Sequence, residues 1–436
     1  MRKFFFPILI VFALLLSACG NAKTATTAST APTVPTAAAN ATTAPGATVP
    51  APTATPYADS QTVCKPYNFI DEIFPTSLVP IPDVTSADRV KGPANAPVTF
   101  IVYTDLQCPY CAEADPIFNA VLKAFPNDVR LVFRHWPLAS IHANALQAAR
   151  AADAAGKQGQ DKFFAMTELL FTNQSVWSSK SAADFTTWLN GKSASLGLDA
   201  AKFAVDWNDP AIAQKVNADL AASDKLGEEL SQAYQTGFGT PTLIINGSPY
   251  MEQRNVELLS LVVNLIKNKN TAVQQCPASI IDPKKDYFAT FTTTKGDIVI
   301  DLLEKVAPVS VNSFISLAQK GWFKDNAFFV VRNELVMTGD KTNTGYGGPG
   351  YAFKDEIDPA YTFDKEGVVG MYNFGPGTNG SQFFILKAPL AALNGQYTIF
   401  GVVTQGMDVL KAMALHETTQ SLDSADKILS VTITEK

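Results

Sequence analysis

Two cysteines separated by two residues, Cys108 and Cys111, directly follow a run that predicts a buried strand. The run, APVTFIVYTDL at 96–106, is rich in β-branched and aromatic residues. Pro109 suits the first turn of a helix, because the N–H that proline lacks would have no partner there. We therefore expect a strand that leads into a helix, with Cys108 at the helix N-terminus.

This position predicts redox chemistry for the pair. Free amide groups and the helix dipole favour a thiolate at Cys108 and lower its pKa, while Cys111, one turn further in, is shielded and can attack a mixed disulfide. The spacing alone also allows half of a zinc site or a structural disulfide. A zinc site needs two further ligands, and neither Cys64 nor Cys276 has a second cysteine at this spacing. We expect a catalytic dithiol and no metal or cofactor.

The N-terminus predicts export. Arg2 and Lys3 precede an apolar run at 4–16 that is short for a membrane span and ends in small residues, as in a secretory signal. The sequence Leu-Ser-Ala-Cys that ends at Cys19 resembles a bacterial lipobox, in which the cysteine is lipidated. We therefore expect a lipoprotein signal peptide at 1–19 and an extracytoplasmic protein, anchored through this cysteine to the bacterial cell membrane. An ordinary signal peptide with an incidental cysteine is the alternative.

Composition divides the rest of the chain. Residues 20–60 form a tether that is almost entirely Ala, Thr and Pro up to residue 56 and cannot build a core. The remainder is longer than one core usually organises, so we expect two domains. The net charge of −6, without a stripe of Lys and Arg, argues against nucleic acid as a partner. The histidines are too few and too scattered for a histidine-based metal cluster.

The two remaining cysteines, Cys64 and Cys276, bracket the segment that contains the CPYC motif. Four thiols allow three pairings, but the motif spacing favours Cys108 with Cys111 and leaves Cys64 with Cys276. Disulfides persist outside the cytoplasm, which favours this structural bridge over two free thiols. The bridge would join the two ends of a first domain at 61–276.

The same region resembles the thioredoxin superfamily. Its hallmarks are CPYC after a strand and GFGTPTLIING at 237–247, which resembles the Thr-Pro turn that faces the dithiol in that superfamily. The resemblance implies an α/β thioredoxin fold in which Pro241 is cis and the backbone of Thr240 contacts a bound peptide. The stretch at 129–171 resembles the DsbA-type branch, which implies a helical insertion at roughly 140–236.

By this resemblance Cys108 would be the nucleophile and Cys111 the resolving cysteine. The two residues between them do not set the direction of exchange. The oxidising compartment favours donation of a disulfide to exported or unfolded polypeptides, and reduction or isomerisation is the alternative. Either direction needs a redox partner, which the sequence does not identify. Asp105 could tune the dithiol or cap the helix, whereas His135 and His142 are interpreted as structural.

A short joint at 277–285 precedes a second domain at 286–436. The beginning of this domain, at 288–303, predicts two alternating strands about a Lys-Gly-Asp turn, and apolar residues at helical spacing follow at 307–323. The glycine-rich stretch at 345–357 lacks the strand–GxxxxGK–helix context of a phosphate-binding loop, so we interpret it as a turn.

Two further stretches resemble the cyclophilin family of prolyl isomerases, namely MYNFGPGTNGSQFFIL at 371–386 and LNGQYTIFGVV at 393–403. The resemblance implies a mostly β fold, a closed antiparallel barrel with two helices. Tyr372 and Phe374 stand where the family has small residues beside the groove. By the same resemblance, the substrate groove includes Asn373, Gln382, Phe384, Leu393 and Tyr397.

Prolyl isomerisation crosses a barrier of about 20 kcal/mol, because amide resonance is lost at the transition state. An apolar proline pocket with a cation near the prolyl nitrogen lowers that barrier. In cyclophilins an arginine supplies the cation, but the matching stretch at 327–340 has Val330 at the expected position and Arg332 two residues later. Arg332 is our candidate for this role. The alternative is a cyclophilin-like module that binds peptides without catalysis.

Together these features predict an anchored folding factor for exported proteins. One domain would exchange disulfides and the other would address proline isomers, which are two slow steps of folding. Two other functions fit the same features. One is a peptide-binding lipoprotein or chaperone in which only the dithiol is catalytic, and the other is a dedicated redox partner of one membrane protein or of a cytochrome maturation system.

Overall fold

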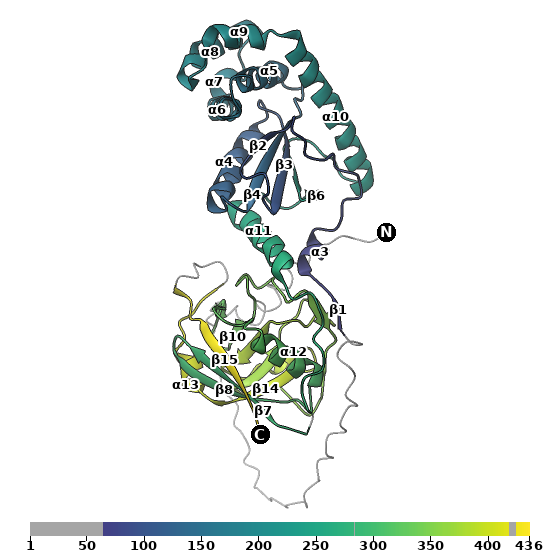
Figure 1. Ribbon diagram of the computed structural model, residues 1–436, viewed down its shortest axis with the longest axis vertical. Coiled ribbons are helices and arrows are strands. Elements are labelled where there is room, and N and C mark those ends of the chain that lie inside the picture. Colours follow the sequence, from purple (N-terminus) through teal and green to yellow (C-terminus); the bar gives the residue numbers. More distant parts are fainter. Residues whose placement is uncertain (1–63, 283, 418–423) are drawn as a thin grey trace, which may run out of the picture.

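The computed structural model describes residues 64–282, 284–417 and 424–436, which form two domains (Figure 1). The signal peptide, Cys19 and the tether that the sequence predicts before residue 61 lie outside the described residues. In the part of the chain that the structure describes, no helix has both the length and the apolar character needed to cross a membrane.

The first domain is a sheet covered by helices on both faces. Its framework consists of β2 (Arg89–Lys91), β3 (Val98–Thr104), α4 (Pro109–Ala124), β4 (Val129–His135), α10 (Pro210–Tyr234), β5 (Thr242–Ile245), β6 (Ser248–Tyr250) and α11 (Val256–Thr271). The strands follow the order β2-β4-β3-β5-β6, with β3 and β4 parallel and the other neighbours antiparallel. Phe100 and Val102 of β3 pack with α4 and α11, whereas Ile101 and Tyr103 pack with α10. This two-sided burial explains the continuous apolar run at β3.

A helical insertion separates the two halves of this domain, as the resemblance implies. The insertion contains α5 (Ala145–Gly156), α6 (Gln160–Thr172), α7 (Gln174–Trp177), α8 (Ala182–Ser193), the short 3-10 helix η1 (Ala194–Leu196) and α9 (Ala200–Trp207), and it ends with α10. Helices α5 to α9 lie at the top of Figure 1. The alanines of α5 allow close packing, and Phe163, Trp177 and Phe185 fill the space between the helices. The same apolar cluster includes Cys108 and Cys111, so the insertion covers the dithiol.

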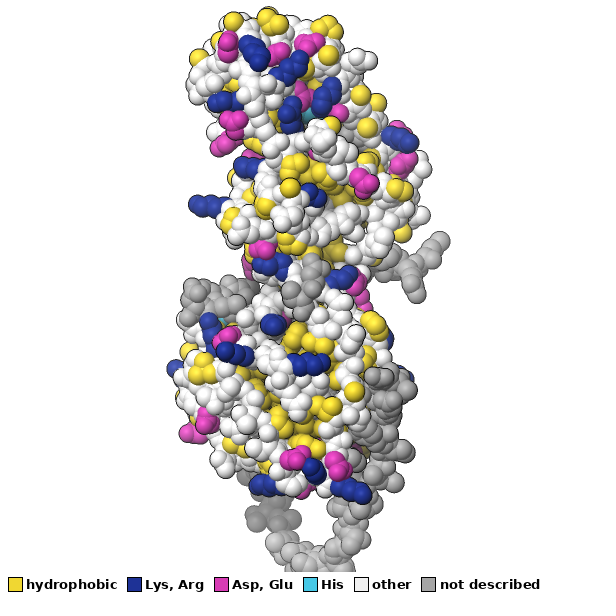
Figure 2. Space-filling view, in the orientation of Figure 1, with side chains coloured by type: hydrophobic (Ala, Val, Ile, Leu, Met, Phe, Trp, Pro, Cys, Tyr) yellow, Lys and Arg dark blue, Asp and Glu magenta, His cyan; other side chains and the backbone are white. Residues whose placement is uncertain are grey.

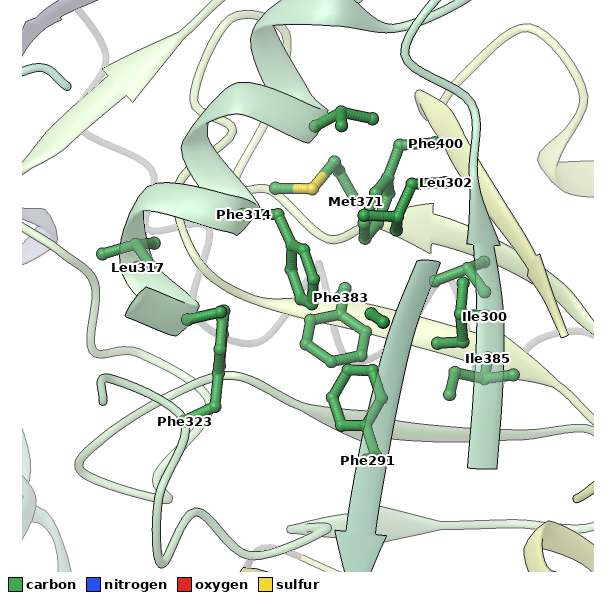
Figure 3. Close-up of a cluster of buried hydrophobic side chains, with 14 of the residues drawn as sticks. Phe291, Ile300, Leu302, Phe314, Leu317, Phe323, Met371, Phe383, Ile385 and Phe400 are labelled. Atoms are coloured by element: carbon green, nitrogen blue, oxygen red, sulfur yellow. The ribbon is translucent and has the colours of Figure 1, made fainter. Parts of the chain in front are cut away.

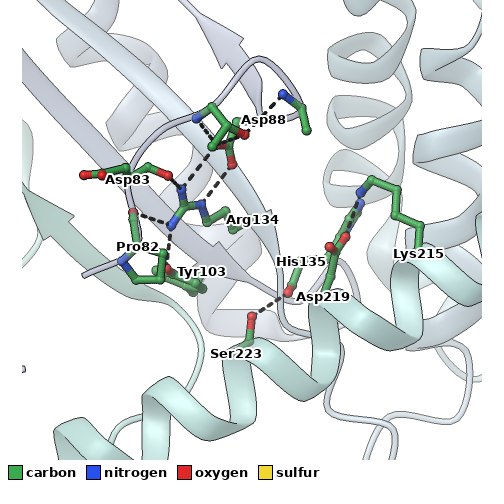
Figure 4. Close-up of polar contacts among 11 residues, drawn as sticks. Pro82, Asp83, Asp88, Tyr103, Arg134, His135, Lys215, Asp219 and Ser223 are labelled. Atoms are coloured by element: carbon green, nitrogen blue, oxygen red, sulfur yellow. Dashed lines mark hydrogen bonds and ion pairs between the residues drawn. The ribbon is translucent and has the colours of Figure 1, made fainter. Parts of the chain in front are cut away.

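A polar cluster fixes the segment before β2 against the sheet (Figure 4). Arg134 of β4 donates to both carboxylate oxygens of Asp88, at 2.9 and 3.2 Å, and to the hydroxyl of Tyr103 at 2.8 Å. It also donates to the backbone carbonyl oxygens of Pro82 and Asp83. A planar guanidinium with five N–H donors can serve all of these acceptors at once, so this arginine holds the segment in place.

The second domain is mostly β. Its strands are β7 (Tyr287–Thr293), β8 (Gly296–Leu302), β9 (Val330–Val331), β10 (Leu335–Thr338), β11 (Tyr351–Phe353), β12 (Val368–Met371), β13 (Phe383–Leu386), β14 (Ile399–Gln405) and β15 (Ile428–Glu435). Its helices in the described residues are α12 (Pro308–Gln319), α13 (Met407–Ala412) and the short 3-10 helix η2 (Ala391–Leu393). Helix α12 packs its apolar face on the sheet, where Phe314 meets Phe291, Phe383 and Phe400 (Figure 3).

The large sheet of this domain is open, so the closed barrel expected from the sequence is wrong. Its strands follow the order β15-β7-β8-β14-β12-β13-β10-β9, which leaves β15 and β9 as edges. The segments before these two strands meet at an isolated bridge between Ala327 and Lys427. Strand β9 has only two residues before the chain turns at Arg332, whose N–H donates to Leu335 O. The outer edge of β9 bonds with His416 rather than with β15, so no ladder joins these two strands in the described residues.

Two segments of chain join the domains, and a disulfide joins these segments. Strand β1 (Cys64–Pro66) pairs with β11 of the second domain, and α3 (Phe69–Ile73) then enters the first domain, where Ile70 is buried. The second connection follows α11. Cys64 is bonded to Cys276, and both cysteines contact the core of the second domain. The bridge that the sequence places at the ends of the first domain therefore lies on the second.

The predicted joint at 277–285 also packs on the second domain. Asn312 of α12 donates to Ala278 O at 3.0 Å and accepts from Ile280 N at 2.8 Å. Ile281 is buried in the core beneath α12. These contacts extend the second domain to a point before residue 286.

Candidate active sites

The CPYC motif lies where strand β3 leads into helix α4. Cys108 is the N-cap residue with an extended backbone, and Pro109 occupies the first helical turn. Cys108 and Cys111 are both free thiols and are only 4% and 2% exposed. The N–H of Cys111 donates to Cys108 O at 3.1 Å, which folds the motif into the first turn. The two sulfur atoms therefore face the same shielded space.

The pKa values of the two thiols are shifted in opposite directions. A hydrogen bond from the Cys111 thiol lowers the pKa of Cys108 to about 6, against the effect of burial, with further help from Thr240 and from the backbone N–H groups of Tyr110 and Cys111. Burial raises the pKa of Cys111, and the neighbouring Cys108 sulfur raises it further. Cys108 is thus a thiolate at neutral pH, while Cys111 keeps its proton.

The Thr-Pro turn before β5 faces the dithiol. The Thr240–Pro241 peptide bond is cis. Cys108 Sγ lies 3.5 Å from the backbone carbonyl oxygen of Thr240. Arg254 Nη2 donates to Pro241 O at 2.8 Å, and burial lowers the pKa of its guanidinium. Sequence reasoning missed Arg254, because a single arginine in a loop carries no motif.

Side chains of the insertion hold the loop before Cys108. Gln174 Nε2 donates to the backbone carbonyl oxygens of Leu106 and Cys108, both at 3.0 Å. Gln107 Nε2 donates to Ser178 O at 2.7 Å, and Gln107 Oε1 accepts from Asn144 N at 2.7 Å. Gln174 and Gln107 thus hold the loop before the dithiol in place. Sequence reasoning missed both, because Gln174 is 66 residues from Cys108 and Gln107 is 71 residues from Ser178.

The carboxylate of Asp105 anchors the same loop, and the Asp105 backbone hydrogen-bonds Cys111. One of its carboxylate oxygens accepts from Gln107 N at 2.7 Å. The other accepts from Leu138 N at 2.8 Å and lies 2.7 Å from His142 Nδ1. His142 therefore acts together with Asp105 as a structural pair, and His135 is buried beside Asp153.

The residues predicted for the cyclophilin-like groove fall into two neighbouring groups. Phe384 and Tyr397 meet edge to face at 5.6 Å between ring centroids, and Leu393 packs against the same apolar cluster. Gln382 and Asn373 belong to a polar group beside it. Asn373 Nδ2 donates to Asp355 and Asn379, which uses its side chain to shape the loop.

Gln382 is oriented by the glycine-rich loop. Its Nε2 donates to Gly345 O at 3.1 Å and to Gly347 O at 2.8 Å. Its Oε1 is buried without a hydrogen-bond partner among the described residues. A buried acceptor of this kind is costly unless something donates to it.

Asp340 organises this loop, and sequence reasoning missed it. The carboxylate of Asp340 accepts from the side chains and N–H groups of Thr342 and Thr344, and from the N–H groups of Gly345, Tyr346 and Gly347. A Cβ on Gly347 would lie 2.1 Å from this carboxylate, so only glycine fits there. The stretch interpreted as a simple turn is therefore an ordered loop wrapped around one carboxylate.

Arg332 is engaged away from this polar group. Its guanidinium binds Glu417 through two hydrogen bonds, Nε to Oε1 at 2.8 Å and Nη2 to Oε2 at 2.9 Å. The hydrogen bond to Glu417 raises the pKa of Arg332. Val330, at the expected arginine position, is buried in the cluster that contains Phe384. To reach a substrate nitrogen, Arg332 would first have to leave Glu417.

Neither a one-signed charge patch on the face shown in Figure 2 nor a metal-binding cluster among the described residues accompanies these sites. On the face shown in Figure 2, Lys and Arg side chains are interspersed with Asp and Glu over both domains. Among the described residues, no group of three or more His, Cys, Asp or Glu side chains could hold a metal ion.

Comparisons with known proteins match the two domains separately. The family described as thioredoxin matches residues 85–264, which contain the five-stranded sheet, the insertion and the CPYC motif. The family described as cyclophilin type peptidyl-prolyl cis-trans isomerase/CLD matches residues 288–434. The first domain is thus thioredoxin-like, and the second is cyclophilin-like.

Several named relatives cover the second domain. Peptidyl-prolyl cis-trans isomerase-like 1 of Aspergillus fumigatus is 41% identical over 142 residues, which are 32% of this chain and 88% of the relative. Peptidyl-prolyl cis-trans isomerase A of Mycobacterium tuberculosis is 37% identical over 177 residues, covering 36% of this chain and 97% of the relative. A solved cyclophilin type peptidyl-prolyl cis-trans isomerase of Cryptosporidium parvum is 30% identical, with a TM-score of 0.32, and the match covers 35% of this chain and 99% of that one. Through its second domain, which follows a thioredoxin-like domain, the chain belongs to the cyclophilin-type peptidyl-prolyl cis-trans isomerase family.

Proposed function

We propose that the protein is a membrane-anchored, extracytoplasmic folding factor that combines thiol–disulfide exchange with prolyl isomerisation. The observation that carries the proposal is the pairing, on one chain, of an acidic Cys108 thiol facing the Thr240–Pro241 turn with a cyclophilin-type domain. Disulfide formation and prolyl isomerisation are both slow steps of folding, and unfolded exported polypeptides need both.

Thiol–disulfide exchange would use the two cysteines in sequence. In the oxidised protein, a thiolate of the client attacks Cys108 Sγ, and the Cys111 sulfur leaves and takes up a proton. A second client thiolate then attacks the client sulfur of the mixed disulfide and releases Cys108 as a thiolate. The client loses two electrons and gains a disulfide, and the dithiol gains the two electrons. A redox partner that accepts two electrons would restore the Cys108–Cys111 disulfide.

The low pKa of Cys108 favours this direction. The hydrogen bond from Cys111 stabilises the Cys108 thiolate, and therefore stabilises the reduced form of the pair. Stabilisation of the reduced form makes the pair more oxidising than a pair with an unperturbed Cys108, which favours donation of its disulfide to clients. Reduction or isomerisation of client disulfides is the alternative.

A test of exchange uses the full chain and a reduced, unfolded protein with two cysteines. The oxidised chain should form one client disulfide per Cys108–Cys111 pair, and Cys108→Ser should abolish this reaction. Cys64→Ser combined with Cys276→Ser is the matched control, because it removes the other bridge and should leave the reaction intact. Equal oxidation by the Cys108→Ser variant would overturn the assignment.

Prolyl isomerisation would depend on the groove of the second domain. Phe384, Leu393 and Tyr397 offer apolar surface for a proline ring, and Gln382 Oε1 offers an acceptor for a peptide N–H. Relatives that are 37–41% identical carry the name peptidyl-prolyl cis-trans isomerase, which supports the same activity here. The missing piece is the cation, for which we propose Arg332.

The engagement of Arg332 by Glu417 favours a second candidate, a peptide-binding module without catalysis. Cis-to-trans isomerisation of a prolyl peptide by the full chain separates the two. Loss of catalysis in Arg332→Ala, with retention or gain in Glu417→Gln, would assign the role to Arg332. Equal catalysis by wild type and Arg332→Ala would remove Arg332 from the mechanism. Binding without catalysis in every form would establish the peptide-binding module.

Anchoring through Cys19 is proposed from the sequence at 16–19. A bacterium that expresses the full chain should retain it in the membrane fraction, and Cys19→Ser should release it. Membrane retention of the Cys19→Ser variant would argue instead for another mode of attachment.

A further inference from the structure

The connection between the domains places an aromatic side chain beside the groove. Phe69, at the start of α3, stacks on Phe374 at 4.4 Å and on Tyr346 at 5.5 Å between ring centroids. Phe374 and Tyr346 are themselves nearly parallel, at 6.1 Å and 6°. We call the faces of Phe374 and Tyr346 that Phe69 contacts the aromatic pocket. Phe69, from the segment that precedes the first domain, therefore covers this pocket.

The aromatic pocket reaches one residue of the predicted substrate groove, Gln382. A single depression is lined by Phe69, Tyr346, Tyr372, Phe374, Thr378 and Gln382. Tyr372 and Phe374 stand where cyclophilins have small residues, so this chain has built aromatic walls at the edge of its groove. Aromatic walls of this kind bind flat apolar side chains.

The segment that carries Phe69 is held on the second domain by few contacts. We call residues 64–70 the cover segment. Tyr67 N donates to Gly350 O at 3.0 Å, and Lys65 and Pro66 pair with Ala352 and Tyr351 in a short antiparallel ladder. Its covalent attachment is the disulfide from Cys64 to Cys276.

The other connection grips the same loop. Gln274 N donates to Pro349 O at 3.0 Å, and Asn268 Nδ2 donates to Gly348 O at 3.0 Å. A Cβ on Gly350 would lie 2.9 Å from Gln274 Cα, so glycine is required for this close approach. The loop that orients Gln382 is thus also the loop that receives both connections from the first domain.

We propose that the cover segment blocks the aromatic pocket against client peptides, and that the Cys64–Cys276 bridge keeps it there. This inference rests on the proposed peptide-binding role of the second domain. The ligand of the pocket is an aromatic side chain near a proline in an unfolded client. A tethered side chain has a high local concentration, so a free peptide must displace Phe69 before it binds.

Reduction of the bridge is the event that opens the pocket. A dithiol transfers two electrons to the Cys64–Cys276 disulfide, which becomes two thiols, and the dithiol becomes a disulfide. Without the covalent bond, the cover segment is held by the short ladder of β1, the stacking of Phe69 and the burial of Ile70 in the first domain. A three-residue strand at an edge is marginal, so Phe69 leaves the pocket for a larger fraction of the time. The affinity for aromatic peptides should then rise.

The test measures peptide binding by fluorescence anisotropy with the full chain. The probes are labelled pentapeptides with one proline and one phenylalanine placed one, two or three residues before it, and the same peptides with alanine in place of phenylalanine. If Phe69 occupies the pocket for nine-tenths of the time, Phe69→Ala should bind the best phenylalanine probe about tenfold more tightly than wild type. The alanine probes should change little.

Two further variants test the role of the bridge. Cys64→Ser with Cys276→Ser should raise the affinity as Phe69→Ala does. In a chain with Cys108→Ser and Cys111→Ser, Cys64–Cys276 is the disulfide among the described residues that dithiothreitol can reduce. Dithiothreitol should then raise the affinity for the phenylalanine probe as Phe69→Ala does. Leu78→Ala is the matched control, because Leu78 is an exposed apolar residue outside the pocket, and its affinity should equal that of wild type.

The outcomes separate this inference from the proposed function. Unchanged affinity in Phe69→Ala and in the bridge variant, with isomerisation of proline peptides intact, overturns the inference alone. Equal gains for alanine and phenylalanine probes also overturn it, because the pocket would then not select an aromatic side chain. Absence of binding and of isomerisation in every form overturns both.

Discussion

Replacement of Cys111 should move the pKa of Cys108 according to the donor that remains. The thiol of Cys111 is the largest cause of the low pKa of Cys108, so Cys111→Ala removes the main donor to its sulfur. Cys111→Ser keeps an O–H donor at the same place. The two variants are closely matched, because each leaves one cysteine in the motif and neither can form the Cys108–Cys111 disulfide.

The expected size follows from the thiolate fraction. With a pKa of about 6, Cys108 has about ten thiolates for each thiol at pH 7. A cysteine with an unperturbed pKa near 8.5 is only about 3% thiolate at that pH. Thr240 and the backbone N–H groups still stabilise the Cys108 thiolate, so Cys111→Ala should react between about threefold and thirtyfold more slowly than Cys111→Ser at pH 7.

The assay is alkylation by iodoacetamide across pH 4 to 10, with the Cys108 peptide quantified by mass spectrometry. The pH at which the alkylation rate of Cys108 is half of its maximum should lie near 6 in Cys111→Ser and clearly higher in Cys111→Ala. Above both midpoints the alanine variant should react somewhat faster, since a more basic thiolate is a better nucleophile. Equal midpoints would refute the reasoning and assign the acidity of Cys108 to the helix N-terminus instead.

Three further changes test the supports of the two sites by urea unfolding. Asp340→Asn should lower the free energy of unfolding by about 3 kcal/mol, because it places an amide group among N–H donors. Asp358→Asn is the control and should lower it far less, because the Asp358 carboxylate accepts a single local hydrogen bond from Ala360 N. Burial opposes ionisation of Asp88, but the hydrogen bonds from its arginine partner outweigh burial and lower its pKa. The stability that ionised Asp88 contributes is therefore present above its unfolded pKa of about 4 and is lost as pH falls through the folded pKa. The free energy of unfolding should consequently fall less between pH 6 and pH 3 in Asp88→Asn than in wild type. Gly350→Ala should destabilise the chain by about 2 kcal/mol, since its φ is +88° and a Cβ would meet backbone, while Gly348→Ala has open space and should change little.

Local sequence was sufficient for the strand-to-helix position of Cys108, which the structure confirms. The Thr240–Pro241 turn and the insertion were expected from the resemblance to the thioredoxin superfamily, and the structure has both of them. The pairing of Cys64 with Cys276 followed from the small number of possible partners. In each case few alternatives had to be distinguished.

Long-range contacts could not be predicted in the same way. Arg332 is the candidate cation because it lies two residues after the expected position, but the sequence does not show that a bidentate bond to Glu417, 85 residues away, holds its guanidinium. The open sheet has a similar origin, because the outer edge of β9 bonds with His416 rather than with β15. Neither the partner of a surface arginine nor the partner of an edge strand has a sequence pattern.

The glycine-rich loop explains why the domains are coupled rather than merely tethered. The carboxylate of Asp340 holds the loop from inside, and the carbonyl groups of the loop orient Gln382. The outer side of the loop receives β1 and the segment after α11, which the disulfide joins to each other. The bridge and Gln382 are therefore linked through one loop of the second domain whose backbone is contacted on both sides. If the proposed opening of the cover segment occurs, this loop is the part of the second domain that the loss of the bridge would affect first.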